Sequence, residues 1–253
     1  MDNSNERTTN IQIQSIEEFV AEVSKNTDFC FRGVSDKGYK LIPSIGRKKE
    51  IKIESLTKIE SGMLRQFKLR AVPLLNFHPT NDWEWLILGQ HHGMPTRLLD
   101  WTQNPLVALY FACSGNDNVD GAIYSILNIP TLDLDKAPNP FDIDNDYMLL
   151  PAHISFRIAA QASIFSVSRN PQIPLEESVE KPLTKYIISS KRKFAILSFL
   201  VLRFGIGPSS LFPGLDGLCE QIALETTTFK NVVYRAEGLI EIADLLKKMK
   251  TTN

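Results

Sequence analysis

The stretch that most constrains the fold is residues 88–113, LGQHHGMPTRLLDWTQNPLVALYFAC. Gly93 and Pro95 interrupt a helical pattern, because glycine commonly follows a last helical turn and proline keeps the residue before it out of the α region. A helical pattern resumes at Asn104-Pro105, where asparagine suits the cap and proline suits the first helical position. The sequence therefore predicts two helices joined by an irregular segment with little conformational freedom.

This predicted loop presents several different polar groups and one large aromatic ring. Thr96 and Thr102 offer hydroxyls, and Asn104 offers an amide. Arg97 has a planar guanidinium that suits a phosphate or a carboxylate. Trp101 offers a flat apolar face on which a base or a nicotinamide ring can stack. These groups are what a ligand site would use.

Each of these side chains also has a structural alternative. Thr102 and Asn104 can cap the second helix, and Arg97 can form a buried ion pair with Asp100. Trp101 can be a core residue. The side chains that helix capping leaves unexplained favour a binding or catalytic site: Gln90, His91, Arg97 and Trp101.

Two more polar residues stand in apolar surroundings. Arg32 ends the strand-like run FCFRGV beside Gly33, and its burial costs several kcal/mol unless it meets an anion. Gly33 lets a ligand or another backbone approach closely. Gln161 follows Arg157 by four positions at the start of a predicted strand, where its amide can bind a ligand hydroxyl. An edge-strand arginine in water and a surface glutamine near a bend are the alternatives.

Helical and strand patterns intermix along the chain without a regular βαβ rhythm. The pattern favours an α+β fold with a single mixed sheet and several flanking helices. We expect one domain over 1–253, with a flexible N-terminus at 1–14 and a closing amphipathic helix at 236–253.

Composition says more about where in the cell the protein is expected than about which reaction it performs. The 253 residues carry a formal net charge of -1, which argues against a general polyanion binder. The most apolar run, residues 194–202, is far shorter than the roughly 20 residues needed to cross a bilayer. Three widely spaced cysteines suggest reduced thiols. We expect a cytoplasmic protein with no membrane contact.

Several common chemistries lack a motif. The sequence contains neither a glycine-rich dinucleotide fingerprint after a strand, nor a P-loop, nor a nucleophile elbow. His91 and His92 are adjacent, whereas a helical metal pair is usually three or four positions apart. No metal site is predicted.

Together these segments resemble the FRG-domain family, which is named for an aromatic-Arg-Gly motif. The matching motifs span about 29–219 and include most of the residues singled out above. They are Phe31-Arg32-Gly33, Leu41 to Ser44 with Arg47, Gln90 to Thr102, Arg157 to Gln161, and Phe212 to Gly217.

The order of these motifs also looks like the layout of ADP-ribosyltransferases, which bind NAD without a dinucleotide fingerprint. The resemblance implies that Arg32 holds the NAD phosphates, and that Thr96 and Thr102 shape the nicotinamide pocket. Gln161 then stands near the position of a glutamate that binds the ribose and steadies an oxocarbenium ion. A glutamine carries no negative charge, so the protein either binds without turnover or uses another carboxylate. The candidates are Asp100, Asp216 and Glu220.

The resemblance thus implies an NAD-dependent ADP-ribosyltransferase that modifies a nucleic-acid or protein acceptor. The implied setting is an intracellular toxin or phage-defence effector with an antitoxin or other neutralising partner. The expected catalytic residues are Arg32, Thr96, Gln161 and His91. The expected NAD-binding residues are Arg32, Gly33, Gln90, Arg97, Trp101, Thr102 and Asn104.

Two alternatives remain open. One is a non-catalytic module that binds a nucleotide or nucleic acid in the same site. The other is a metal-free nuclease with His91 as its base.

Overall fold

The computed structural model describes residues 8–25, 27–47, 50–127, 129–134, 136–152, 155–180 and 182–226. The contacts divide the chain into two compact units, 1–197 and 198–253. A single domain over 1–253 stays a prediction, and the predicted helix at 236–253 lies outside the described residues.

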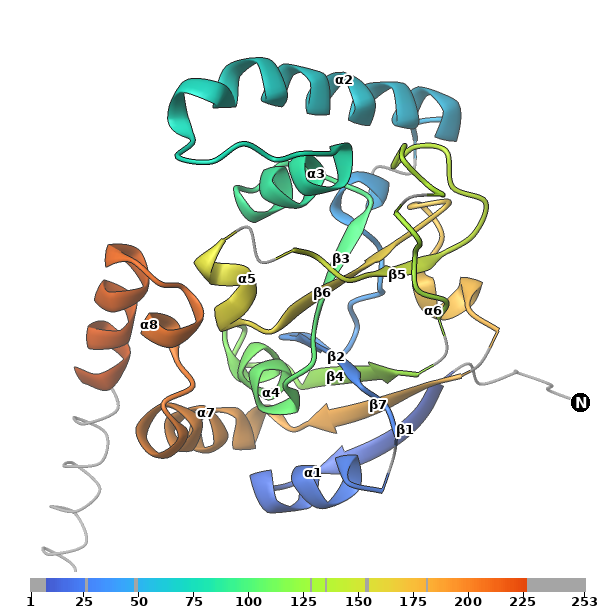
Figure 1. Ribbon diagram of the computed structural model, residues 1–253. Helices are drawn as coiled ribbons and strands as arrows, with labels where there is room; N and C mark the ends of the chain where they lie inside the picture. The colour runs from blue at the N-terminus through green and yellow to red at the C-terminus, as the bar shows by residue number, and fades with distance from the viewer. Residues whose placement is uncertain are drawn as a thin grey trace, which may run out of the picture. The chain divides into compact units, whose positions relative to one another are not determined.

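A single mixed sheet forms the centre of the first unit (Figure 1). Its strand order is β1-β7-β4-β2-β3-β6-β5, with β1 parallel to β7 and the other neighbours antiparallel. This sheet with its flanking helices confirms the predicted α+β class. The strands are β1 (Thr8–Ile13), β2 (Cys30–Val34), β3 (Leu98–Thr102), β4 (Gly121–Ile126), β5 (Tyr147–Leu149), β6 (Ser163–Val167) and β7 (Leu183–Ile188).

Side chains cap several of the helices, including the predicted cap at Asn104. Ser15 Oγ accepts the amide of Glu18, and Asn81 and Asn104 cap the two helices that flank the polar stretch. In the first unit the helices are α1 (Ile16–Val23), α2 (Ile53–Ala71), α3 (Asp82–His91), α4 (Pro105–Cys113), α5 (Phe156–Ala160) and α6 (Leu175–Ser178), with 3₁₀ turns η1 (Ser44–Arg47) and η2 (Val72–Leu74). Helix α7 (Ser190–Phe204) spans the boundary between the units, and α8 (Pro208–Leu211) and helical residues 215–226 belong to the second.

Two segments differ from their predictions. Part of the N-terminus expected to be flexible is strand β1, which pairs with β7 at every residue from Thr8 to Ile13. The segment expected to be irregular contains strand β3, which pairs with β6 from Leu98 to Thr102. In both cases the partner strand is distant in the sequence, so only the tertiary fold reveals the pairing.

Strand β3 shows how the sheet separates two apolar clusters. Successive side chains of a strand point to opposite faces. Leu98 joins a cluster with Leu64 of α2 and Trp83 of α3. Leu99 and Trp101 join a different cluster on the other face.

The packing of α4 on the sheet depends on Gly33 in β2. A Cβ atom at this position would stand 1.9 Å from the carbonyl oxygen of Ala108 and 2.8 Å from the amide nitrogen of Ala112. Both contacts are backbone atoms of α4, so no side-chain rotation relieves them. The glycine therefore allows α4 to lie directly against β2.

No helix within the described ranges is both long enough and apolar enough to span a membrane.

We predict that Gly33→Ala lowers the free energy of unfolding by about 1–3 kcal/mol, because an added methyl in a packed region forces the backbone to shift. Gly62→Ala is the matched control, since no heavy atom lies within 4 Å of its added Cβ. Inside helix α2 that change should instead stabilise by about 0.5–1 kcal/mol. Denaturant unfolding of both variants measures the two effects, and equal stabilities would contradict this account of α4.

Candidate functional site

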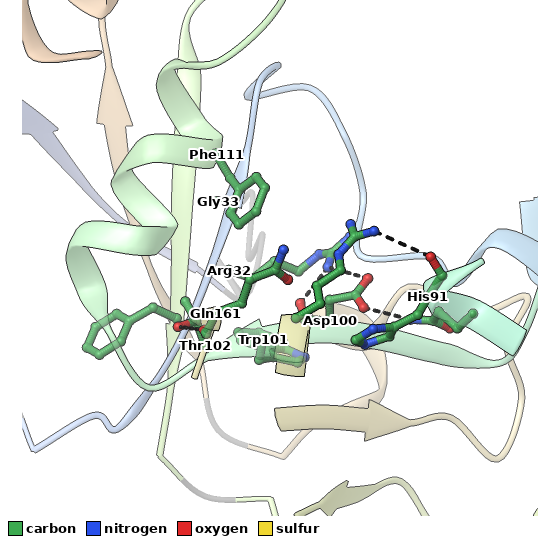
Figure 2. A pocket seen from close by; sticks show the side chains of 11 residues that line it. Arg32, Gly33, His91, Asp100, Trp101, Thr102, Phe111 and Gln161 are labelled. Carbon is green, nitrogen blue, oxygen red and sulfur yellow. Dashed lines mark hydrogen bonds and ion pairs between the residues drawn. The ribbon is translucent and has the colours of Figure 1, made fainter. Parts of the chain in front are cut away.

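The candidate site lies where the sheet splits. Strand β2 pairs with β4 at five positions, Cys30–Val34, but its described pairing with β3 is confined to Phe31 and Thr102. The two strands therefore diverge beyond this pair. A cavity of about 230 Å³ opens there, bordered by residues of both strands (Figure 2). Its lining residues are Phe31, Arg32, Gly33, Gln90, His91, Asp100, Trp101, Thr102, Phe111, Arg157 and Gln161.

Arg32 reaches across the split between the strands. Its Nη1 donates a hydrogen bond to the backbone carbonyl of Asp100 and lies 3.7 Å from the carboxylate Oδ2 of the same residue. Its buried Nε has no hydrogen-bond partner within the described structure. Burial lowers the pKa of Arg32, Asp100 opposes this shift, and the nearby Arg47 adds to it. An unused donor on a desolvated cation is suited to an anionic ligand.

Asp100 supplies the carboxylate of the cavity. Its Oδ1 accepts a hydrogen bond from Gln90 Nε2 at 3.0 Å, and its side chain is 54% exposed. It is the one acidic residue in the cavity lining given above. The other two carboxylates considered from the sequence, Asp216 and Glu220, belong to the second compact unit.

Thr102 and Gln161 join β3 to the end of α5. The Thr102 hydroxyl donates to the carbonyl oxygen of Gln161 at 2.7 Å and accepts from the amide of Asn104 at 3.0 Å. Thr102 thus fixes the backbone at the edge of the cavity, while Gln161 itself is buried and contributes to the lining. Figure 2 shows Arg32, Asp100 and Gln161 around the same cavity.

His91 and Arg157 form a second polar group of the lining. Burial lowers the pKa of His91 to about 4, with a smaller opposing effect of Asp100 and a further lowering by Arg157 and His92. The imidazole is therefore neutral at pH 7. Arg157 Nη1 donates to the backbone carbonyl of His91 at 3.4 Å, and burial lowers the pKa of Arg157 as well.

Arg97 does not line the cavity, although the sequence suggests an anion ligand there. Its Nε lies 2.9 Å from Glu60 Oε2 and its backbone amide donates to Glu60 Oε1 at 2.7 Å. The two side chains are 2% and 0% exposed. Burial raises the pKa of Glu60, and the charge and hydrogen bonds of Arg97 oppose that shift. Arg97 is thus an internal residue, and its partner is Glu60 instead of Asp100.

Trp101 belongs to the cavity lining, and its indole also packs in the core. Its indole lies in the core cluster of the opposite sheet face, and its Nε1 donates to Ser166 Oγ at 2.9 Å. The strand alternation of β3 explains this, because Asp100 and Trp101 are neighbours and must point to opposite faces. The aromatic residues of the lining are Phe31, Trp101 and Phe111.

Thr96 and Asn104 likewise lie outside the cavity lining. Thr96 is fully buried. Asn104 caps helix α4, where its Oδ1 accepts the amide of Leu106 at 3.0 Å. The predicted residues that do meet at the cavity are Arg32, Gly33, Gln90, His91, Trp101, Thr102 and Gln161.

Sequence reasoning left out three lining residues, Arg157, Phe111 and Phe31. Arg157 stands in the same motif as Gln161, and Phe31 stands in the same motif as Arg32. Membership in these motifs is the sequence signal that could have identified Arg157 and Phe31 as site residues. Phe111 lies in the apolar run of α4 and carries no local signal of a site.

Nowhere in the described ranges do three or more His, Cys, Asp or Glu residues come together in a group that could hold a metal ion.

The fold and the site define an α+β domain with a charged cavity in a split sheet. Residues 27–121 match the FRG domain family, so the chain contains an FRG domain. This match covers β2, β3 and α4 and ends before Arg157 and Gln161. No curated protein and no solved structure matches the chain.

We predict a pH dependence of stability from His91. The pKa is about 4 in the folded protein against an ordinary 6.5, so the unfolded chain binds the proton more tightly. The free energy of unfolding should fall as the pH drops from about 6.5 to about 4 and should not depend on this group above that range. The loss is about 1–3 kcal/mol, below the full value for such a shift because the ring is partly exposed.

His91→Asn removes this dependence, and denaturant unfolding at several pH values measures it. His78→Asn, at an exposed position, is the matched control and should keep the wild-type slope. A wild-type slope in His91→Asn would contradict the assignment.

Proposed function

We propose that the cavity binds NAD and that the protein transfers ADP-ribose from NAD to a nucleophile on a macromolecule. One observation carries the proposal: a guanidinium (Arg32), a carboxylate (Asp100) and an amide (Gln161) border the same cavity. The combination offers one group for a phosphate, one for a developing positive charge and one for a ribose hydroxyl.

Arg32 is the group for the phosphates. Its Nε is buried without a partner among the described residues, and a phosphate oxygen would satisfy it with a charge-assisted hydrogen bond. The guanidinium also faces the carboxylate of Asp100 at 3.7 Å, so the ligand would add a second anion beside the first.

Asp100 provides the negative charge that Gln161 lacks. When the bond between nicotinamide and ribose C1′ breaks, the electron pair leaves with nicotinamide and positive charge develops on the ribose. A carboxylate held in place by Gln90 stabilises that charge without reorganising. The acceptor then forms its bond to C1′ and releases its proton, which the half-exposed Asp100 can take up.

The size of the cavity indicates which part of NAD it holds. Ligand pockets commonly measure about 300–1,000 Å³, and this cavity of about 230 Å³ is smaller. We therefore place only the nicotinamide and its ribose inside, beside the rings of Phe31 and Phe111. The adenosine half would lie outside the cavity.

The toxin or phage-defence setting belongs to the same proposal. A nucleic-acid or protein acceptor, a neutralising antitoxin and a cytoplasmic location all rest on the resemblance to ADP-ribosyltransferases.

A non-catalytic nucleotide-binding module is the second candidate. The observation that favours it is the engagement of Asp100, which both Gln90 and Arg32 contact. A nuclease with His91 as its base has less support, because a group with a pKa of about 4 is a weak base at neutral pH.

We predict that the wild-type protein, incubated with NAD labelled in its adenine and with total cell extract, releases nicotinamide and labels a macromolecule. Asp100→Asn should bind ADP-ribose within about fivefold of wild type, while nicotinamide release falls by about 10²–10³, the usual effect of removing one stabilising group. Arg32→Gln should weaken ADP-ribose binding by about 1.5–3 kcal/mol, the value of a hydrogen bond to a charged group.

Asp142→Asn, an exposed carboxylate that does not line the cavity, is the matched control and should behave as wild type. Saturable binding of NAD without nicotinamide release would establish the binding module instead. If the protein neither binds nor consumes NAD, the proposed ADP-ribosyl transfer fails.

A further inference from the structure

A chain of hydrogen bonds runs from the protein interior to the carboxylate of Asp100. The amide of Leu98 donates to Thr96 Oγ1 at 3.2 Å. The Thr96 hydroxyl donates in turn to Gln90 Oε1. Gln90 Nε2 then donates to Asp100 Oδ1 at 3.0 Å. Residues that the sequence separates by up to ten positions are thus joined through their polar atoms.

The direction of this chain is fixed by its outer end. A carboxylate can only accept, so Gln90 must present its NH₂ group to Asp100 and its Oε1 to Thr96. The backbone amide of Leu98 can only donate, so it occupies one lone pair of the Thr96 oxygen and leaves the hydroxyl proton for Gln90 Oε1. A reversed Gln90 amide would place an oxygen against a carboxylate oxygen, which is repulsive.

Thr96 is a rigid anchor for this chain. It is fully buried, and its backbone amide donates to Ser44 Oγ at 3.1 Å. Ser44 Oγ lies 3.4 Å from the Thr96 carbonyl oxygen, which also accepts the amide of Ile45 at 3.2 Å. These contacts tie Thr96 to the 3₁₀ turn η1, so its hydroxyl has little freedom to move.

The outer end of the chain needs such an anchor. The Asp100 side chain is 54% exposed, and an exposed carboxylate has no packing to select its orientation. Gln90 holds Oδ1, which leaves Oδ2 toward Arg32 at 3.7 Å.

We propose that Thr96 and Gln90 are positioning residues for the Asp100 carboxylate. The Thr96 hydroxyl anchors the Gln90 amide by its oxygen, and the amide holds the carboxylate toward the cavity. Thr96 acts without touching a ligand. The catalytic consequence rests on the proposed ADP-ribosyl transfer, whereas the hydrogen-bond geometry does not.

The test compares Thr96→Val, which keeps the shape but removes the hydroxyl, with Thr96→Ser, which keeps the hydroxyl. For NAD consumption by the full-length protein, Thr96→Val should lower kcat by about 10- to 100-fold and leave KM within about threefold. Thr96→Ser should stay within about threefold of wild type in both. Thr57→Val is the control, because its hydroxyl accepts from Arg97 at 3.4 Å outside the cavity lining.

A second measurement does not depend on turnover. The side-chain NH₂ resonances of Gln90, assigned by their loss in Gln90→Leu, should shift in Thr96→Val and not in Thr96→Ser or Thr57→Val. If wild type does not consume NAD, the proposed function fails and these resonances alone decide the positioning role. If Thr96→Val does not fold, Gln90→Leu replaces it and should show the same loss of kcat at unchanged KM.

Unchanged Gln90 resonances in folded Thr96→Val would overturn the proposal. So would an equal loss of kcat in the valine and serine variants, since serine retains the hydroxyl donor.

Discussion

The cavity depends on how the backbone amide and carbonyl groups find hydrogen-bond partners where strands β2 and β3 separate. A strand that leaves its neighbour exposes carbonyl and amide groups, and buried backbone groups are nearly always paired. Here the Arg32 side chain bonds the Asp100 carbonyl across the gap. The arginine thus replaces a ladder hydrogen bond and at the same time brings a cation to the cavity, with its Nε still unused in the described structure.

The walls of this gap are held by packing and by a buried charge pair. Gly33 lets α4 lie against β2, and α4 carries Phe111 to the cavity. On the other side, the Arg97–Glu60 pair joins the start of β3 to helix α2. Removing one partner of such a pair commonly costs about 3–5 kcal/mol, because the remaining charge stays buried. Arg32 and Arg97 both belong to the matching motifs, but their roles differ: Arg97 is structural, and Arg32 faces the cavity.

Features encoded by neighbouring residues could be predicted from the sequence. The helix cap at Asn104 depends on the amide of Leu106, two positions away, and the predicted start of helix α4 is correct. The α+β class follows from the mixture of helical and strand patterns, and it is confirmed. The motifs also placed Arg32 and Gln161 in one site before the structure brought both to one cavity.

Features that need a distant partner could not be predicted. Strand β3 is defined by its pairing with β6, in which Leu98 lies opposite Val167 and Thr102 lies opposite Ser163. Gly93 and Pro95 precede the strand and led to the prediction of an irregular segment. Because strand β3 was not predicted, the alternation of side chains that points Trp101 into the core could not be predicted either. The partner of Arg97 is Glu60, 37 positions away on α2, so the nearer Asp100 was the natural choice.

The most direct test of the split-sheet cavity is a crystal structure of the protein with ADP-ribose. The diphosphate should lie within hydrogen-bond distance of Arg32 between β2 and β3, with the ribose beside Asp100 and Gln161. Bound ADP-ribose elsewhere on the protein, or continuous pairing of β2 with β3 that closes the gap, would contradict the account.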